Sequence, residues 1–446
     1  MSIESDYAAL HPRSAALHER AVKVLPSGVT HDSRYLRPFL IALERADGPR
    51  KWDVDGLEYV DYVMGHGSLL LGHNFPAVQG AVAAQLARGT HYGGNHELEV
   101  AWAEAIVRLV PSAEVVRFTS SGTEATLMAL RLARAASGKP GVLKFDRHFH
   151  GWHDYLIAGS RYAGGAIPPG VPAATLDSVA VVAPEMEVVA KTVAQRGDIG
   201  AIILEPAGAT SGALPLPQRF LHDLRAFTKE RGIVFIMDEV VTGFRWAPGG
   251  VQEVEGVVPD LTTLAKILAG GLPGGAVAGK REIMARLAFP VPGARADKVG
   301  HPGTFNANPL SAAAGVACLA EAATGEHQRQ AAAMAAQLRA GLNGVLCRLG
   351  IPGVAYGLTS DMHLVVGAGT VPEETDYRPE ALALDLLSRG TEPELARQLQ
   401  LALLNRGVHF FGGSGFVSSV HSEADIAATL DGWEGALRAV RAEGLL

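Results

Sequence analysis

The middle of the chain alternates short apolar runs with amphipathic stretches, and this pattern limits the possible folds more than any other feature. We predict helices at 123–137, which Gly138 ends, and at 218–231. Strands that alternate with helices predict a mainly parallel sheet covered on both faces. Ligands on such sheets bind at the carboxyl ends of the strands. The apolar runs that we interpret as strands are 115–118, 142–145, 179–182, 201–204, 233–237 and 261–264.

The two ends of the chain differ from this middle part. Residues 38–63 read as short strands around the turn at Asp53–Gly56, and residues 327–342 and 394–405 read as helices rich in Ala, Leu and Arg. A chain of 446 residues suits one large domain and one smaller one. We therefore predict a large domain at 75–320 and a small α+β domain formed by 1–74 and 321–446.

Composition excludes several classes of protein. The net charge of −7 argues against a protein that holds nucleic acid. No run approaches the ~20 apolar residues that cross a membrane, and residues 1–17 lack the apolar core of a signal peptide. Cys318 and Cys347 lie in no metal-binding or disulfide spacing, so we expect two buried thiols, no metal and a cytoplasmic protein.

A polar cluster, Thr119–Ala125, lies between a predicted strand and a predicted helix. Backbone N–H groups at a helix start, with the hydroxyls of Ser121 and Thr123, suit a phosphate, and Gly122 allows close approach. Taken alone, the cluster reads more simply as an ordinary helix cap.

Asp238 and Glu239 end the apolar run 233–237. A buried acid there needs a partner, and Asp238 could keep the ring nitrogen of a pyridine protonated. The alternative is a metal-binding acid of a nucleotide-binding protein. No G-x-x-x-x-G-K-[ST] sequence occurs in the chain, which removes most support for that alternative.

Lys266 ends the run 261–264 and is the only cation between Trp246 and Gly279. A desolvated lysine becomes a nucleophile towards a carbonyl carbon. The alternative is a lysine that extends from the sheet edge into solvent. The glycines at 270–275 favour the first interpretation mildly, because we expect them to clear space beside the lysine.

Two further segments carry groups suited to a flat, phosphorylated ligand. In 145–153, Phe149 could stack on a ring, or it could be a core aromatic beside a solvated loop. In 303–309, the hydroxyl of Thr304 could contact a phosphate, or contact nothing. The order of these groups along the chain, more than any one of them, is typical of a pyridoxal 5′-phosphate (PLP) site.

With these motifs the chain resembles the class III (ω-type) PLP-dependent aminotransferases, and within them the glutamate-1-semialdehyde 2,1-aminomutase subgroup. The resemblance runs from about Val24 to the C-terminal helix and rests on 121–125, 149–151, 237–245, 259–266 and 303–304. It implies PLP fold type I, with a mostly parallel seven-stranded sheet in the large domain and a homodimer with shared active sites.

The resemblance also implies residue roles. Lys266 would carry PLP as a Schiff base and act as the general base, and Asp238 would pair with the ring nitrogen. The remaining cofactor-binding residues would be Ser121, Gly122, Thr123, Phe149, His150, Glu205, Val240 and, reaching the phosphate of the neighbouring subunit, Thr304.

Substrate recognition is expected at three positions. Arg34 matches the arginine that the subgroup places near the substrate carboxylate, although an exposed loop arginine is the alternative. His66 stands where the subgroup has an aromatic residue, and Gly413 where it has a glutamate. The glycines at 412, 413 and 415 suggest room for a bulkier group.

These departures favour an aminotransferase that transfers an amino group between a β- or ω-amino acid with a carboxylate and a keto acid. The alternatives are glutamate-1-semialdehyde aminomutase and a PLP-dependent lyase or decarboxylase on the same scaffold. A regulatory PLP-binding protein need not keep Lys266, and an NAD enzyme would need a G-x-G-x-x-G after a strand, which this sequence lacks.

Overall fold

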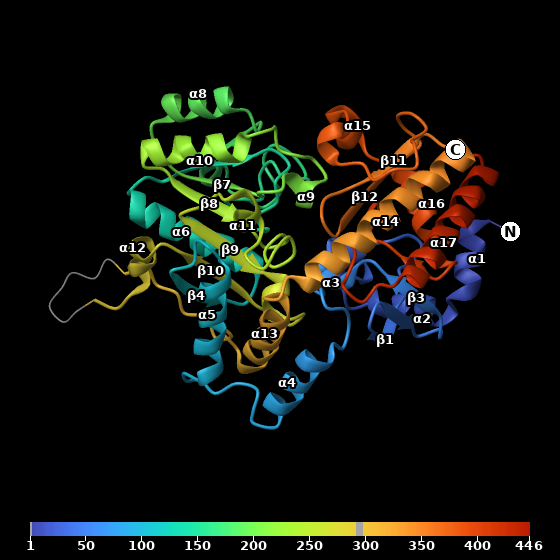
Figure 1. Cartoon of the computed structure of the whole chain (residues 1–446), viewed down its shortest axis with the longest axis horizontal. Coiled ribbons are helices and arrows are strands. Elements are labelled where there is room, and N and C mark those ends of the chain that lie inside the picture. Colours follow the sequence, from blue (N-terminus) through green and yellow to red (C-terminus); the bar gives the residue numbers. More distant parts are fainter. Residues whose placement is uncertain (1, 291–297) are drawn as a thin grey trace. The chain divides into compact units, whose positions relative to one another are not determined.

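The computed structural model describes residues 2–290 and 298–446. Backbone contacts divide the chain into two compact units (Figure 1). Unit 1 comprises Met1–Phe75 and Arg329–Leu446, and unit 2 comprises Pro76–Gln328. Within the described part of the chain, every helix is too short or too polar to cross a membrane.

Unit 2 is built on a seven-stranded sheet with the order β4-β10-β9-β8-β7-β5-β6. All neighbours pair in parallel except β10, which is antiparallel to both β4 and β9. This confirms the predicted α/β fold with a mostly parallel sheet. The strands are β4 (Val115–Thr119), β5 (Gly141–Phe145), β6 (Val179–Val182), β7 (Ile199–Leu204), β8 (Val234–Asp238), β9 (Leu261–Ala265) and β10 (Gly275–Gly279).

Strand β10 was not predicted. Its sequence, GAVAG, has a single β-branched residue and glycine at both ends, which is unfavourable for a strand taken alone. The two strands that flank it supply its hydrogen bonds, and the small residues let those neighbours approach closely.

Helices cover both faces of this sheet, because successive side chains of a strand point to opposite faces. Ile203 and Ile236 pack with α6 (Gly122–Ser137), whereas Leu204 and Phe235 pack with α10 (Phe220–Arg231). Figure 1 shows α8 beside α10. The other helices of unit 2 are α4 (Pro76–Leu86), α5 (Glu97–Leu109), α7 (Ala173–Leu176), α8 (Met186–Arg196), α9 (Ala209–Gly212), α11 (Val251–Glu255), η3 (Lys266–Ala269), α12 (Arg281–Met284), η4 (Ala285–Leu287) and α13 (Pro309–Ala322).

Two helix ends show how local sequence sets the boundaries. Ser121 caps α6 by accepting the backbone N–H of Glu124, and Gly138 ends it with φ of +68°. The predicted start of α10 at 218 is two residues too early, because Arg219 has φ of +62° and is not helical.

Unit 1 combines both ends of the chain around one apolar core. Its four-stranded sheet contains β1 (Leu43–Asp47), β2 (Arg50–Asp53), β3 (Glu58–Asp61) and, parallel to β3, β13 (Val408–His409). A three-stranded antiparallel sheet contains β11 (Gly353–Tyr356), β12 (Asp361–Val366) and β14 (Ser414–Phe416). The helices are α1 (Ile3–Leu10), α2 (Pro12–Ala21), η1 (Pro26–Gly28), η2 (Asp32–Arg34), α3 (Met64–Gly67), α14 (Glu326–Leu349), η5 (Pro379–Ala381), α15 (Leu384–Arg389), α16 (Pro393–Leu404) and α17 (Glu423–Ala442).

Neither cysteine lies in a disulfide, and the prediction that both are buried is wrong. Cys318 is buried in α13, whereas Cys347 is exposed. Position 347 lies in the last turns of α14, where the helix turns this side chain towards solvent.

Candidate active site at the carboxyl edge of the sheet

Five parallel strands of unit 2 end at one edge of the sheet, and each is followed by a polar group from the predicted set. Because these strands run in the same direction, groups far apart in the sequence meet at this edge. The groups are Ser121 after β4, His150 after β5, Glu205 after β7, Asp238 at the end of β8 and Lys266 after β9.

Asp238 is the buried centre of this edge. Its Oδ2 lies 2.7 Å from Nδ1 of His150, and its Oδ1 accepts the backbone N–H of Val240 at 3.1 Å and the hydroxyl of Thr263 at 3.0 Å. Burial raises the pKa of Asp238 to about 6, while these donors and the positive charge of Lys266 oppose the rise. The carboxylate is therefore charged at neutral pH, and it lies where a cationic partner would be strongly held.

His150 is buried and neutral. Burial lowers its pKa well below the ordinary value, so Nδ1–H donates to the Asp238 carboxylate. The hydroxyl of Thr126 donates to the His150 carbonyl at 2.6 Å and fixes the backbone. His150 thus orients Asp238 without neutralising it.

Glu205 connects this edge to two loops. Its carboxylate accepts the backbone N–H of Phe149 at 2.8 Å, of Ser211 at 3.2 Å and of Thr210 at 3.4 Å. Thr210 and Ser211 both have positive φ, so successive N–H groups converge on one carboxylate. Burial and the negative charge of Asp238 together raise the pKa of Glu205 to about 7, while the three N–H donors oppose the rise.

Lys266 has φ of +53°, a conformation that costs a non-glycine residue roughly 1–3 kcal/mol. It follows the last residue of β9, Ala265, and begins the short η3 turn, which Gly270 ends with φ of +58°. A lysine kept in strained backbone at a strand end, with its charge acting on Asp238, indicates a functional constraint.

The N-terminus of α6 forms a cradle for an anion. The Ser121 hydroxyl accepts a hydrogen bond from the N–H of Glu124. Helix geometry leaves the N–H groups of Gly122 and Thr123 without an intrahelical acceptor. A Cβ at Gly122 would lie 3.0 Å from the Val240 side chain, so glycine lets this helix start approach the end of β8.

Two further glycines bring neighbouring segments together. A Cβ at Gly151 would lie 2.7 Å from the hydroxyl of Thr123, and one at Gly275 would clash with the carbonyl of Ser121. The expectation that the glycines at 270–275 clear open space beside Lys266 is therefore wrong for Gly275. That residue is small because two backbone segments pass each other there.

The residues at this edge fit PLP on the structure's own features. A helix start with available N–H donors and a glycine cradle suits a phosphate. A buried carboxylate beside a lysine at the next strand end suits a protonated pyridine ring with an aldehyde. Among the described residues, no group of three His, Cys, Asp or Glu is arranged to hold a metal ion.

Thr304 and the ring of Phe149 have contacts with other segments of unit 2. Thr304 is exposed on a turn whose carbonyl accepts His91 Nε2 at 2.7 Å, so the structure ties it to the loop before α5. The Phe149 ring packs edge-on against Tyr162, with centroids 5.0 Å apart. The phosphate contact of Thr304 and the cofactor contacts of Phe149 and Val240 remain predictions.

The three residues predicted to contact substrate, Arg34, His66 and Gly413, lie in unit 1, on segments that meet there. The His66 ring stacks on His31 at 4.9 Å and packs edge-on against Phe411 at 5.3 Å. His31 lies three residues before Arg34, and Phe411 two before Gly413. The backbone of His66 has φ of +58°, between two glycines that also have positive φ.

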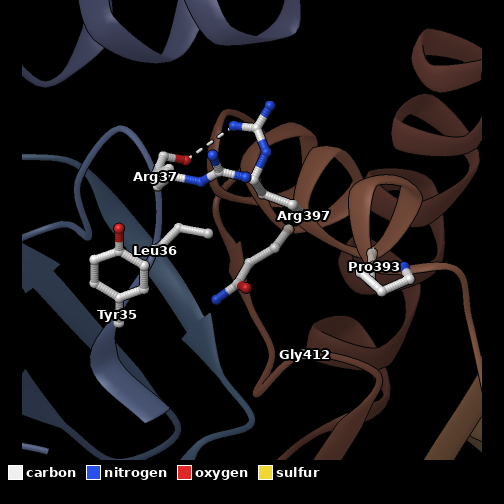
Figure 2. A pocket seen from close by; sticks show the side chains of 8 residues that line it. Tyr35, Leu36, Arg37, Pro393, Arg397 and Gly412 are labelled. Atoms are coloured by element: carbon white, nitrogen blue, oxygen red, sulfur yellow. Dashed lines mark hydrogen bonds between the residues drawn. The ribbon is translucent and has the colours of Figure 1, made fainter. Parts of the chain in front are cut away.

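A small cavity lies where the segments next to Arg34 and Gly413 meet (Figure 2). Tyr35, next to Arg34, and Gly412, next to Gly413, both line it. Arg397 fixes the segment by donating to the Arg37 carbonyl at 3.0 Å. At about 240 Å³ the cavity is smaller than ordinary ligand pockets, which are roughly 300–1,000 Å³.

Gly413 and Gly415 contradict the expectation of room for a bulkier group. A Cβ at Gly413 would lie 2.8 Å from the carbonyl of Leu364, and one at Gly415 would lie 2.8 Å from the ring of Phe410. These glycines are small because their own unit packs closely around them. Only at Gly412 would an added Cβ meet open space.

Sequence reasoning missed three residues of this region. Thr263 donates to Asp238, His148 accepts the N–H of Glu205 at 2.9 Å, and Lys144 holds three backbone carbonyls. The available signal was a polar residue at an inward-facing position of an apolar strand, as in Lys144 between Leu143 and Phe145.

Comparison with known proteins gives a consistent family. Residues 32–348 match the family profile "Aminotransferase class-III". A curated relative from Chloroflexus aggregans, named glutamate-1-semialdehyde 2,1-aminomutase, is 39% identical over 94% of this chain and 96% of its own. An omega-transaminase from Sphaerobacter thermophilus is 34% identical, with a TM-score of 0.86 over 96% of this chain and 98% of its own. A transaminase solved with PLP bound is 30% identical, with a TM-score of 0.85 over 98% and 99%.

Proposed function

The chain belongs to the class III aminotransferase family, and on this premise we propose that it transfers amino groups with PLP held at the carboxyl edge of the unit 2 sheet. The observation that carries the proposal is the pairing of a buried carboxylate, Asp238, with a strained lysine, Lys266, at the ends of adjacent strands.

In this proposal Lys266 would hold the aldehyde of the cofactor, and Asp238 would hold its ring nitrogen. The N-terminus of α6, with Ser121, Gly122 and Thr123, holds the phosphate. When bound, PLP supplies a pyridine ring that stabilises negative charge on the carbon next to the substrate nitrogen.

The chain's own groups then move and hold protons. Once the substrate amine has replaced it on the aldehyde, the released Lys266 amine would take the proton from the carbon next to the substrate nitrogen and return it to the former aldehyde carbon, as a general base and then a general acid. The Asp238 carboxylate keeps a positive charge on its partner atom, and neutral His150 keeps the carboxylate oriented. Glu205 fixes the backbone at Phe149, so that this loop keeps its place at the sheet edge.

Two finer reactions are proposed on this scaffold. The curated relative favours the aminomutase, in which one molecule of glutamate-1-semialdehyde both gives and receives the amino group, over the aminotransferase that the sequence analysis preferred. The aminotransferase is supported by the two solved transaminases and by His66 and Gly413, which differ from the aminomutase subgroup. No observation favours a lyase or decarboxylase.

Product analysis separates the two reactions. The holoprotein would be incubated with glutamate-1-semialdehyde alone, and separately with β- or ω-amino acids plus pyruvate or 2-oxoglutarate. An aminomutase forms the isomer whose amino group has moved from C2 to C1 and needs no keto acid. An aminotransferase forms the new amino acid only when the keto acid is present. Absence of both activities, in protein that binds PLP, would contradict the proposal.

The assembly is also a proposal. We propose that unit 2 and unit 1 act as the large and small domains, and that the protein is a cytoplasmic homodimer in which Thr304 reaches the partner's phosphate. The exposed turn at Thr304 and the exposed rings of Phe305 and Trp152 support it. Sedimentation would give the mass of the assembly, and mixing two inactive variants, Thr304→Ala and Lys266→Ala, would test shared sites through recovery of activity.

A further inference from the structure

A fully buried lysine outside the proposed cofactor contacts lies on β5. Lys144 is 0% exposed, in a strand whose residues are all buried. A buried ammonium is unfavourable unless its protons find acceptors. Its Nζ donates to the backbone carbonyls of Leu156 at 2.6 Å, Ala158 at 2.8 Å and His148 at 3.0 Å. These three bonds use all three of its protons.

The three carbonyls belong to the two flanks of a single loop, residues 148–158. His148 begins the loop, and Leu156 and Ala158 end it. At its base, the N–H of Arg147 donates to the Gly159 carbonyl at 2.6 Å. The Lys144 side chain therefore holds both flanks of the 148–158 loop at the end of β5.

The 148–158 loop carries two of the proposed cofactor contacts. The N–H of Phe149 donates to Glu205, and Nδ1 of His150 donates to Asp238. The position of both groups depends on the backbone path that starts at His148, which Lys144 holds directly. Disorder of this backbone would displace the partner of Asp238 and the aromatic ring together.

The charge of Lys144 acts on the same groups. Burial lowers its pKa to about 8, while the negative charges of Glu205, Asp146 and Asp238 oppose the fall, so it is mostly protonated at neutral pH. After burial itself, its positive charge is the cause that lowers the pKa of His150. Lys144 thus helps to keep His150 neutral and able to donate to Asp238.

We propose that Lys144 is a positioning residue for the cofactor, whose ammonium pins the 148–158 loop so that Phe149 and His150 are set in place before substrate binds. The proposal rests on the proposed function, because it assumes that PLP binds at this edge.

The test compares three variants as holoproteins. Lys144→Met removes the charge and the donors at nearly constant volume. Lys144→Gln keeps an N–H donor pair without the charge. Val142→Ala is the control, because Val142 is also 0% exposed, lies two residues away and points to the same face of β5.

Three readouts are measured besides activity: hydrogen exchange of the 148–158 peptide, the rate of PLP release, and the circular dichroism of the bound cofactor. For Lys144→Met we expect hydrogen exchange of the loop and PLP release to be about tenfold faster, which corresponds to the loss of one to two net hydrogen bonds. We also expect a weaker circular dichroism signal from the bound cofactor. Lys144→Gln should recover part of each change. Val142→Ala should lower the melting temperature while all three readouts stay within about twofold of wild type, since a general loss of stability does not displace the loop.

The outcomes separate this proposal from the proposed function. Wild-type protein that binds no PLP would overturn the proposed function itself. Wild-type protein that binds PLP, with Lys144→Met unchanged in all three readouts, would overturn only the assignment of Lys144. Equal effects of Lys144→Met and Val142→Ala would also overturn it, because they would leave only a packing contribution.

Discussion

The proposed cofactor edge of unit 2 and the segments of unit 1 predicted to contact substrate are built in opposite ways. In unit 2 the functional groups are buried, stand at strand ends and bond to one another, as Asp238 does with His150 and Thr263. In unit 1, Arg34 and His66 lie in short turns, and ring stacking connects their segments. A rigid sheet can position the groups for the chemistry that all family members share, whereas a change in a loop can alter which substrate is bound.

The largest expected effect tests the sheet side of this comparison. We expect Lys266→Ala to lower kcat/KM by at least about 10³-fold, because it removes the group that moves the proton. Steady-state kinetics would measure this, with Lys139→Ala, an exposed lysine of the same unit, as the control. Near-normal turnover in Lys266→Ala would show that the strained backbone at 266 serves another purpose.

The next effect concerns charge at the buried centre. Asp238→Asn preserves shape and removes the carboxylate, so we expect kcat to fall by at least about 10²-fold. Because the pKa of Asp238 is raised to about 6, the carboxylate is charged above that pH and lost below it. PLP affinity of the apoprotein should therefore weaken below pH 6 by up to about tenfold per pH unit in wild type.

Titrations of the apoprotein with PLP at a series of pH values would measure this dependence. The same titrations on Asp238→Asn and on Asp146→Asn provide the check. Asp146 is exposed and lies just after β5, so its substitution should leave the profile unchanged. If Asp238→Asn kept the wild-type decline below pH 6, a different group would be responsible for it.

A smaller effect is expected on the loop side. If Arg34 binds a substrate carboxylate, Arg34→Ala should raise KM by about 10- to 100-fold, the value of a charged hydrogen bond, and change kcat little. Arg37→Ala is a matched control, since Arg37 is an exposed arginine of the same segment. Equal KM changes in both variants would indicate general electrostatic attraction rather than a specific contact.

The smallest effect tests the corrected interpretation of the glycines. Gly413→Ala should lower stability by about 1–3 kcal/mol, because the new Cβ would lie 2.8 Å from the Leu364 carbonyl. Gly80→Ala, in a helix with open space around it, should be neutral or stabilising by up to about 1 kcal/mol. Thermal melting would show both. An unchanged melting temperature for Gly413→Ala, with altered substrate preference, would instead support the original expectation that this glycine leaves room for substrate.

Most of the sheet could be predicted because its signals are local. Apolar runs and the Gly138 stop placed the strands and α6 to within a few residues, and strand ends then located Asp238 and Lys266, whereas Glu205 was expected only from the family resemblance. Strand β10 could not be predicted, since neighbours rather than its own residues stabilise it. The three bonds of Lys144 join residues up to 14 positions apart and depend on a loop path that no sequence period encodes. The tight packing at Gly413 likewise depends on β12, about fifty residues earlier in the chain.

The most direct test of the central claim is to find which lysine carries the cofactor. The holoprotein would be reduced with borohydride, digested and analysed by mass spectrometry, which fixes any bond between a lysine nitrogen and the aldehyde carbon. We predict the added phosphopyridoxyl mass on the peptide that contains Lys266. The same mass on Lys144 or another lysine, with Lys266 unmodified, would contradict the assignment of the active site.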